Sequence, residues 1–424
     1  MAEAATTSTK LELAEDTVVS IRDLHVEFPT VIGRVRALNG VSYDVPRGKV
    51  LGIVGESGCG KSVTARAIMQ IIEKPGKITG GEILFRPGRV ERTAGKRARG
   101  TGTEAPANGN GDAKLVDQHD IREDIPELAR SGIIDLTTLD PHGPQMRAIR
   151  GQEIAMIFQE PMTSLNPVYT VGDQIREAIL LHQTKDKDEA DRRAVDMLRR
   201  VGMPNPPRVA KSYPHQLSGG MRQRAMIAMA LSCIPTLLIA DEPTTALDVT
   251  TEAQILELMR ELQAEFGMSI MFITHSMGVV AQLCDEVVVM YLGRVVERAS
   301  VDDLFYNPKH PYTISLLRSI PRIGVSRHQP LEVIKGSVPD PYSTVTGCPF
   351  HPRCPSVMPG LCDTVMPLET AVEGTGHTAR CHLYPGSTPA DVSSAATAEA
   401  APVAVDGSKD GSADGSADVE RGDS

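Results

Sequence analysis

The first ninety positions of the chain alternate between short apolar runs and turn residues. Residues 18–21, 24–28, 41–45, 50–54 and 80–85 are short and rich in Val, Ile, Leu and Phe, which is typical of β-strands. Turn residues such as glycine and proline lie between several of these runs. The sequence therefore predicts a strand-rich N-terminal part.

Farther along the chain the pattern changes to helices that alternate with strands. Residues 171–202 and 221–233 carry apolar positions at the spacing of an amphipathic helix. The all-apolar runs 237–240, 270–274 and 286–291 have the length of buried parallel strands, with helices between them. This alternation predicts an α/β fold with a parallel sheet.

Three segments differ from this pattern. Residues 1–17 are small and polar, residues 86–125 carry few large apolar side chains, and residues 385–424 are rich in Ser, Ala, Gly and Asp. Such compositions bury too little apolar surface to offset the entropy of ordering. We predict a disordered leader, a solvated insertion and a disordered acidic tail. Contact between the arginines of the insertion and anionic lipid headgroups is an alternative.

Composition narrows the classes of protein. With 424 residues, 41% of them hydrophobic and 23% charged, the chain is long enough for two or three domains and a sizeable core. The net charge is −10, of which residues 385–424 contribute −6 through eight acids and two bases. This sign argues against a protein that coats nucleic acid with its whole surface. No run approaches the ~20 apolar residues of a spanning helix, and we expect a cytosolic chain.

A glycine-rich segment follows the strand at 50–54 and precedes a helical run. This order is the context of a phosphate-binding loop, in which backbone N–H groups and a helix N-terminus hold phosphate oxygens. Lys61 is expected to bridge the β- and γ-phosphates, and Ser62 to bind Mg²⁺. A glycine-rich turn without a ligand is the alternative, against which strand, lysine and hydroxyl argue together. The expected ATP-binding residues are Gly55, Glu56, Ser57, Gly58, Cys59, Gly60, Lys61, Ser62 and Val63.

Two acids end the apolar run at 237–240. Asp241 is expected to hold Mg²⁺, usually through water, and Glu242 to act as the general base toward the attacking water. Acids at a strand end are often a helix cap instead, but the phosphate loop favours catalysis. His275 follows the run at 270–274 and could bond the γ-phosphate and that water, although a lone histidine is more often structural.

A second anion-binding helix start is predicted at residues 217–221. Glycine amides and the helix N-terminus could hold a phosphate there as the first loop does. The segment consists of Leu217, Ser218, Gly219, Gly220 and Met221.

Together these motifs resemble those of the ATP-binding-cassette (ABC) family in order and approximate spacing, over roughly residues 18–297. The resemblance implies an ABC ATPase domain at 18–300, with a RecA-like parallel sheet core, an antiparallel β-subdomain and an α-helical subdomain at about 160–235. The matching residues are the phosphate loop, Gln159, the 217–221 signature, Asp241-Glu242, Ala246-Leu247-Asp248 and His275.

The resemblance also implies roles. Two cassettes pair head to tail, so that each ATP lies between the phosphate loop of one protomer and the signature of the other. Gln159 would bind the Mg²⁺ and the attacking water and link them to the helical subdomain that meets the membrane partner. Asp248 would lie at the dimer seam. An aromatic side chain would stack on adenine; Phe28 is the candidate, Tyr43 lies near it, and a Phe in an alternating strand is as often core.

Residues 151–167, Met221 and residues 307–313 resemble the oligopeptide and dipeptide importers of this family, which carry a C-terminal extension, here 301–384. The implied partners are a second ATPase subunit, a paralogue more often than self, two transmembrane permease subunits and an extracellular peptide-binding protein. The implied location is the cytoplasmic face of the cell membrane. We expect no nucleic-acid partner.

Three other functions stay open. They are an importer of nickel or another small solute, a soluble cassette ATPase that acts on DNA or ribosomes, and a non-catalytic regulatory cassette. The chain has neither sustained heptads nor a second phosphate loop. Glu242, Ser218 and His275 are intact, which argues against the regulatory cassette.

Four cysteines lie in a proline-rich part of the extension, namely Cys348, Cys354, Cys362 and Cys381. Four thiolates on loops could complete a zinc site or a [4Fe–4S] cluster. The absence of Cys-x₂-Cys pairs favours the cluster over Zn²⁺, as does the resemblance to peptide importers, some of which carry one. Unligated buried thiols are the other alternative. A mixed ligand set would include His351, His377 or His382.

Overall fold

The computed structural model describes most of the chain. The described residues are 12–88, 132–159, 164–245, 247–320, 334–340, 342, 345–372 and 376–388. Most of the predicted insertion, most of the predicted acidic tail and the first eleven residues of the predicted leader lie outside the described residues.

The N-terminal strands form a four-stranded antiparallel sheet in the order β2-β1-β4-β5. The two strands predicted before residue 30 are one strand, β1, which pairs with β2 along its length. The pairing register shifts between Ile21 and Leu24, where Asp23 has a φ of 45°, so a bulge replaces the predicted break. The strands are β1 (Thr17–Thr30), β2 (Gly33–Pro46), β4 (Lys77–Phe85) and β5 (Ile134–Asp135).

A second, eight-stranded sheet has the order β11-β12-β10-β9-β3-β8-β7-β6. Strands β9, β3, β8, β7 and β6 run parallel, and β3, β7 and β8 are buried along their whole length, as expected where both faces are covered. The predicted parallel sheet is confirmed. The strands are β3 (Val50–Val54), β6 (Ile154–Ile157), β7 (Leu237–Asp241), β8 (Ser269–Ile273), β9 (Glu286–Tyr291), β10 (Arg294–Ser300), β11 (Thr370–Ala371) and β12 (Thr378–Ala379).

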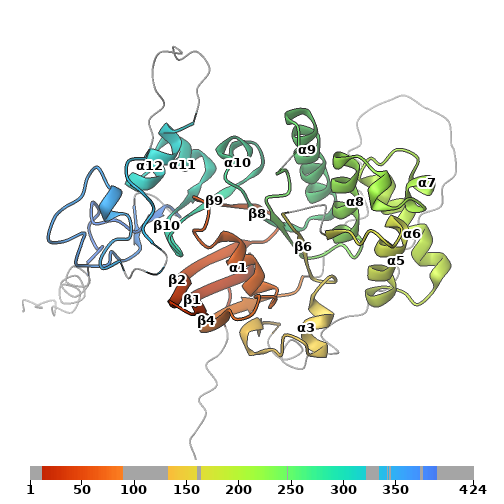
Figure 1. Cartoon of the computed structure of the whole chain (residues 1–424), viewed down its shortest axis with the longest axis horizontal. Coiled ribbons are helices and arrows are strands. Elements are labelled where there is room, and N and C mark those ends of the chain that lie inside the picture. Colours follow the sequence, from red (N-terminus) through yellow and green to blue (C-terminus); the bar gives the residue numbers. More distant parts are fainter. Residues whose placement is uncertain are drawn as a thin grey trace, which may run out of the picture.

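Helices gather at one end of this sheet and also follow its strands (Figure 1). The helical pattern predicted at 171–202 is interrupted, because Asp186 accepts hydrogen bonds from the N–H groups of Asp188 and Glu189 and so starts a second helix. The helices are α1 (Lys61–Ile68), α3 (Pro144–Ile149), α5 (Val171–His182), α6 (Lys187–Arg200), α7 (Pro206–Ala210), α8 (Gly219–Leu231), α9 (Val249–Phe266), α10 (Met277–Leu283), α11 (Val301–Tyr306) and α12 (Pro311–Arg318).

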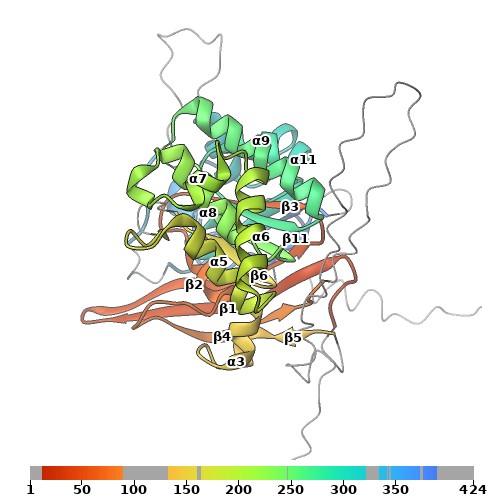
Figure 2. The same cartoon turned by 90° about the vertical axis from the view of Figure 1, so that its right-hand side faces the viewer.

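The helical end, α5 to α8, lies opposite the C-terminal extension, that is, the described residues from 301 to 384 (Figure 1). Figure 2 views the molecule from the helical end, with the antiparallel sheet below the helices. The extension continues the main sheet, because β12 pairs with β10, with Glu297 opposite Ala379. Its core joins Tyr291 of β9 to Tyr312 and Phe350.

Among the described residues, no helix has the length and apolar character needed to cross a bilayer.

Candidate nucleotide site

The phosphate loop joins the end of β3 to the start of α1. Gly60 caps α1 with a φ of 104°, a left-handed conformation that favours glycine. Gly55 allows close packing, since a Cβ there would come within 2.2 Å of the Met290 carbonyl oxygen. A Cβ on Gly58 would meet nothing within 4 Å. The loop is thus packed against β9 at its base and open at its tip, as a cradle for phosphate groups requires.

The Lys61 side chain lies along the loop itself. Its ammonium group donates to the carbonyl oxygens of Gly55, at 2.8 Å, and Glu56, at 3.1 Å. Cys59 is buried below, and burial raises the pKa of its thiol despite the nearby Lys61 charge. The positive charge of Lys61 therefore lies within the phosphate loop, where it could neutralise the charge of a bound phosphate.

Ser62 lies in the first turn of α1, and Asp241 ends β7; the two side chains are in contact. The Ser62 hydroxyl donates to the Asp241 carboxylate at 2.9 Å. Burial raises the pKa of Asp241, the Ser62 hydrogen bond opposes this shift, and the Glu242 charge adds to it. Two oxygen groups at this distance are suited to Mg²⁺, which prefers oxygen ligands.

Glu242 joins the other two predicted catalytic residues. The Gln159 amide donates to one Glu242 carboxylate oxygen at 3.1 Å, and His275 Nδ1 lies 3.3 Å from the other. Glu242 has a φ of 48°, and its N–H donates to the Ile273 carbonyl. The Thr245 hydroxyl also donates to this carboxylate, at 3.2 Å, a contact that the sequence analysis did not identify.

The signature segment lies apart from the phosphate loop of the same chain, at the start of α8 (Figure 1). Ser218 caps this helix by accepting from the Met221 N–H at 3.4 Å, while Leu217 is buried. Ser218 and Gly219 are exposed, and a Cβ on Gly219 would meet nothing. Asp248 caps α9, and the hydrogen bond from the Thr251 N–H lowers its pKa.

The two aromatic candidates for adenine stacking differ in environment. Phe28 of β1 is half-buried at the edge of the core, beside Gly76. Tyr43 is buried, and its hydroxyl lies 3.5 Å from the Met271 sulfur. Tyr43 is therefore a core residue, and Phe28 stays the predicted stacking residue.

The four cysteines of the extension lie near one another without forming a compact site. Burial raises the pKa of Cys381 to about 12, and the charges of Cys348, Cys354 and Cys362 add to this shift. All four thiols are free of disulfides. Among the described residues, however, no group of three or more His, Cys, Asp or Glu side chains is placed to hold a metal ion. The donor chemistry fits a thiolate-bound metal, but the predicted site is not supported by this geometry.

The comparisons with known proteins agree with these motifs. Residues 38–245 match the family model for the ABC transporter, and residues 296–362 match the oligopeptide/dipeptide transporter, C-terminal region. The dipeptide transport ATP-binding protein DppD of Bacillus subtilis (strain 168) is 44% identical over 367 residues, 86% of this chain and 94% of that protein. The oligopeptide transport ATP-binding protein OppD of Escherichia coli (strain K12) is 42% identical over 359 residues, 85% of this chain and 91% of that protein.

One solved structure with low sequence identity to this chain supports its fold and nothing more. The dimeric, post-hydrolysis ATP-binding cassette MJ0796 bound to ADP and Pi is 23% identical, with a TM-score of 0.50, and the match covers 67% of this chain and 98% of that one. The fold and the site thus define an ATP-binding cassette. The chain belongs to the ABC transporter family, with the C-terminal region of its oligopeptide/dipeptide transporters, and it is an ATPase.

Proposed function

We propose that this ATPase powers the import of dipeptides or oligopeptides, as a peripheral subunit at the cytoplasmic face of the cell membrane. The names of the relatives that span most of the chain support a peptide substrate. The observation that carries the catalytic part is the contact of Glu242 with both Gln159 and His275, next to the Ser62–Asp241 pair.

Hydrolysis would transfer the γ-phosphoryl group of ATP to water. The water oxygen attacks phosphorus while the bond to the β–γ bridging oxygen breaks, and ADP leaves with that electron pair. Glu242 takes the proton of the water, and Lys61 neutralises phosphate charge. Ser62, Asp241 and Gln159 would hold Mg²⁺, which supplies further neutralisation of that charge.

The exposed signature supports a pair of cassettes as the working unit. Ser218 and Gly219 lie at a helix N-terminus that is open to a partner, and such a terminus favours anions. The second copy of this arrangement would come from another ATPase subunit, a paralogue more often than self. Each ATP would then contact residues of both subunits.

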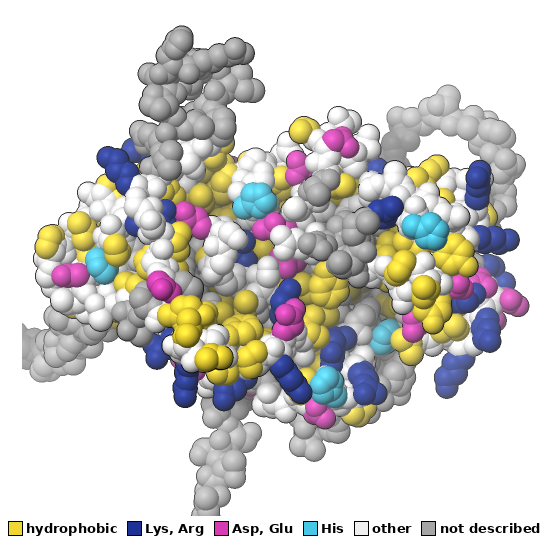
Figure 3. Space-filling model, in the orientation of Figure 1, with side chains coloured by type: hydrophobic (Ala, Val, Ile, Leu, Met, Phe, Trp, Pro, Cys, Tyr) yellow, Lys and Arg dark blue, Asp and Glu magenta, His cyan; other side chains and the backbone are white. Residues whose placement is uncertain are grey.

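The helical end offers a surface for the membrane permease subunits. A groove of about 770 Å³ is lined by Arg147, Leu180, Leu181 and Lys185 among others. Hydrophobic side chains gather at this end of the molecule (Figure 3), and Val168, Tyr169 and Leu181 are exposed. Exposed apolar side chains around a groove are typical of a protein interface. The peptide-binding protein would act on the far side of the membrane.

Uptake by whole cells tests the substrate. Cells that lack this subunit should lose uptake of labelled dipeptides, and the wild-type chain should restore it while the Glu242→Gln variant should not. Uptake of Ni²⁺, measured in the same cells, should be unchanged. Normal dipeptide uptake in the deletion strain would overturn the proposal, and loss of Ni²⁺ uptake alone would favour a nickel importer.

We further propose that Cys348, Cys354, Cys362 and Cys381 would hold a [4Fe–4S] cluster, with Zn²⁺ as the alternative. Four thiols that are free of disulfides support this proposal, and they lie close enough together that, beside burial, the charges of the other three act on the pKa of Cys381. The chain purified without oxygen should contain iron and absorb visible light, and Cys381→Ser should remove both while Cys233→Ser should not. A colourless protein with zinc would favour zinc, and a metal-free one would favour unligated thiols.

A further inference from the structure

The C-terminal extension contacts the phosphate loop through one ion pair whose arginine side chain is buried. Arg353 donates to both carboxylate oxygens of Glu56, at 2.7 and 3.1 Å. The Arg353 side chain is 4% exposed and that of Glu56 is 26% exposed. Two parallel hydrogen bonds fix direction as well as distance. Glu56 follows Gly55 directly, so the pair acts on the first limb of the loop.

Arg353 is itself held on a rigid support. It ends a short 3₁₀ helix, His351–Arg353, within the Cys348–Cys354 segment. Its guanidinium donates to the Tyr291 hydroxyl at 3.3 Å and lies 5.9 Å from the centre of the Tyr291 ring. Because Tyr291 belongs to β9, next to β3 in the main sheet, the guanidinium has little freedom to move relative to the loop.

A second contact joins the extension to the same loop residue. The Glu56 N–H donates to the Tyr312 hydroxyl at 2.9 Å. The rings of Tyr291, Tyr312 and Phe350 pack together, with centroid distances between 4.7 and 5.4 Å. Glu56 thus has its carboxylate and its N–H bound by extension residues, while its carbonyl accepts from Lys61.

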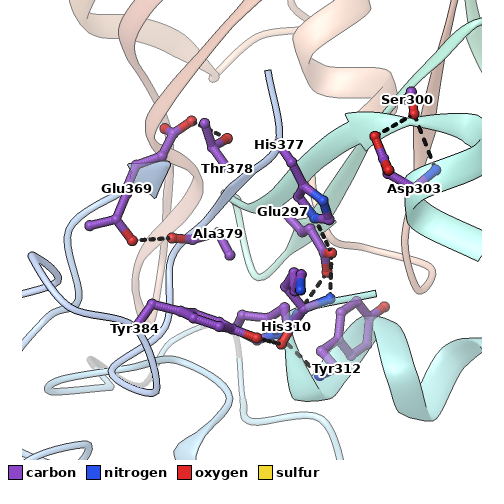
Figure 4. Close-up of polar contacts among 12 residues, drawn as sticks. Glu297, Ser300, Asp303, His310, Tyr312, Glu369, His377, Thr378, Ala379 and Tyr384 are labelled. Carbon is purple, nitrogen blue, oxygen red and sulfur yellow. Dashed lines mark hydrogen bonds and ion pairs between the residues drawn. The ribbon is translucent and has the colours of Figure 1, made fainter. Parts of the chain in front are cut away.

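A buried polar network around Glu297 of β10 supports the start of α12, the helix that carries Tyr312 (Figure 4). The Glu297 carboxylate accepts from the N–H groups of Lys309 and His310 at 2.7 and 2.8 Å. His377 Nε2 lies 2.9 Å from the same carboxylate. His310 then accepts from the Tyr312 N–H at 3.1 Å and starts α12. These bonds fix the extension to the sheet on which the loop stands.

A different explanation of the Arg353–Glu56 pair is that it only helps to attach the extension to the rest of the chain. Another ion pair, Arg380 with Glu369, stays inside the extension at 3.5 Å and is partly exposed. Such a pair adds little to stability. The Arg353 pair differs because it is bidentate, its arginine side chain is only 4% exposed, and it ends on the phosphate loop. Desolvation of the Arg353 guanidinium offsets much of the attraction within the pair, so the pair is weak evidence for added stability.

We propose that Arg353 is a positioning residue for ATP turnover, which acts through Glu56 to hold the phosphate loop in its binding geometry, with Tyr312 as a second support. The extension is then part of the nucleotide machinery, in addition to any metal that it binds. This inference rests on the catalytic roles proposed above for the phosphate loop and its neighbours.

The test compares Arg353→Met, Glu56→Gln and the double variant in the transporter purified with its permease subunits. Each single change should raise the KM for ATP about fivefold to 50-fold, and kcat should change less. The double variant should match the more affected single variant, because both changes break the same contact. Arg353→Lys should restore part of the loss, since it keeps the charge but not the fork.

Arg380→Met is the matched control, because it removes an arginine of the extension that does not touch the loop; its KM should equal that of the wild type. Tyr312→Phe removes only the hydroxyl and tests the second support if Arg353→Met fails to fold. Additive effects of the two single changes, or a lower melting temperature with an unchanged KM, would overturn the inference. Lys61→Ala separates the two proposals: it should abolish turnover whether or not Arg353 positions the loop.

Discussion

The nucleotide site, here called the corner (Lys61, Ser62, Gln159, Asp241, Glu242 and His275), and the four-cysteine segment were both expected from the sequence and its resemblance to a known family, but they differ in the structure. In the corner, the predicted partners make direct hydrogen bonds, Ser62 with Asp241 and Gln159 with Glu242. In the extension, the charges of Cys348, Cys354 and Cys362 add to the effect of burial on the pKa of Cys381, but among the described residues the cysteines form no group that could hold a metal ion.

The difference follows from the secondary structure that supports each site. The corner lies at the ends of adjacent parallel strands, with Ile53 and Asp241 both opposite Ile273 in the ladder. Ligand sites form at such strand ends because the sheet fixes the loops that follow. Cys348, Cys354 and Cys362 lie on irregular segments around the short 3₁₀ helix His351–Arg353, and Cys381 follows the two-residue strand β12. A sheet positions a site without its ligand, whereas a loop site depends on the ligand for its final geometry.

The largest effect is expected from Glu242→Gln in the corner. The amide cannot accept the proton of the attacking water, so the ATPase rate of the purified transporter should fall about 10²-fold to 10⁴-fold. The phosphate loop is unchanged, so ATP should still bind and should remain trapped. A filter assay for retained nucleotide and a phosphate-release assay measure the two quantities.

The control for this change is Glu252→Gln on α9, in the same part of the chain but without a predicted role in catalysis. It should leave phosphate release unchanged. Unchanged hydrolysis in Glu242→Gln would refute the general-base assignment. It would also refute the contrast between a corner whose catalytic side chains are already in contact and an extension whose cysteines form no metal-binding group.

The next effect concerns the extension and depends on pH. Burial lowers the pKa of His310 to about 4, against the opposing pull of Glu297. The unfolded chain therefore binds a proton near pH 6.5 that the folded chain refuses, and stability is lost as pH falls. Between pH 7.5 and pH 5 this residue should reduce the free energy of unfolding by about 2 kcal/mol.

Urea denaturation at several pH values measures this loss. Between pH 7.5 and pH 5 the free energy of unfolding of His310→Gln should fall by about 2 kcal/mol less than that of the wild type, which gives a shallower slope against pH, even if the variant is less stable at every pH. His142→Gln, an exposed histidine, serves as the control and should keep the slope. Equal slopes for wild type and His310→Gln would show that the buried network is not what makes the extension sensitive to acid.

A smaller effect is expected from Ser62→Ala. The change removes the hydroxyl that donates to Asp241 at 2.9 Å and that is expected to bind Mg²⁺. The Mg²⁺ concentration needed for half-maximal ATPase activity should rise about tenfold, as for the loss of one hydrogen bond to a charged group. Ser62→Thr keeps the hydroxyl and should behave as wild type. An unchanged requirement in Ser62→Ala would place the ion elsewhere in the corner.

The motifs of the corner could be recognised in the sequence because each of them is local. The strands β3, β7, β8 and β9 lie where apolar runs predicted them, and each catalytic candidate follows one strand or a short segment after it. The bulged strand β1 was predicted as two, because Asp23 in a left-handed conformation interrupts the apolar pattern without ending the pairing. The apolar runs in a sequence do not show where a strand continues through a bulge.

The contact between Arg353 and Glu56 could not be predicted in this way. The two residues are 297 positions apart, and each lies in a motif with another apparent role, a phosphate loop and a cysteine cluster. The Glu297 network was missed for a similar reason: a buried acid is costly unless it is paired, and its partners, His310 and His377, come from segments that only the tertiary fold brings together.

The smallest effect should separate stability from turnover within the extension. Ser300 caps α11, where its hydroxyl accepts from the Asp303 N–H at 3.1 Å and donates to the Asp303 carboxylate at 2.7 Å. Ser300→Ala should lower the free energy of unfolding by about 1 kcal/mol, as measured by urea denaturation. Ser315→Ala is a matched control, because Ser315 bonds a carbonyl within α12 and caps nothing. Neither change should alter the KM for ATP, because neither touches Glu56. A raised KM in Ser300→Ala would mean that any weakening of the extension disturbs the phosphate loop, so that Arg353 has no special part in holding it.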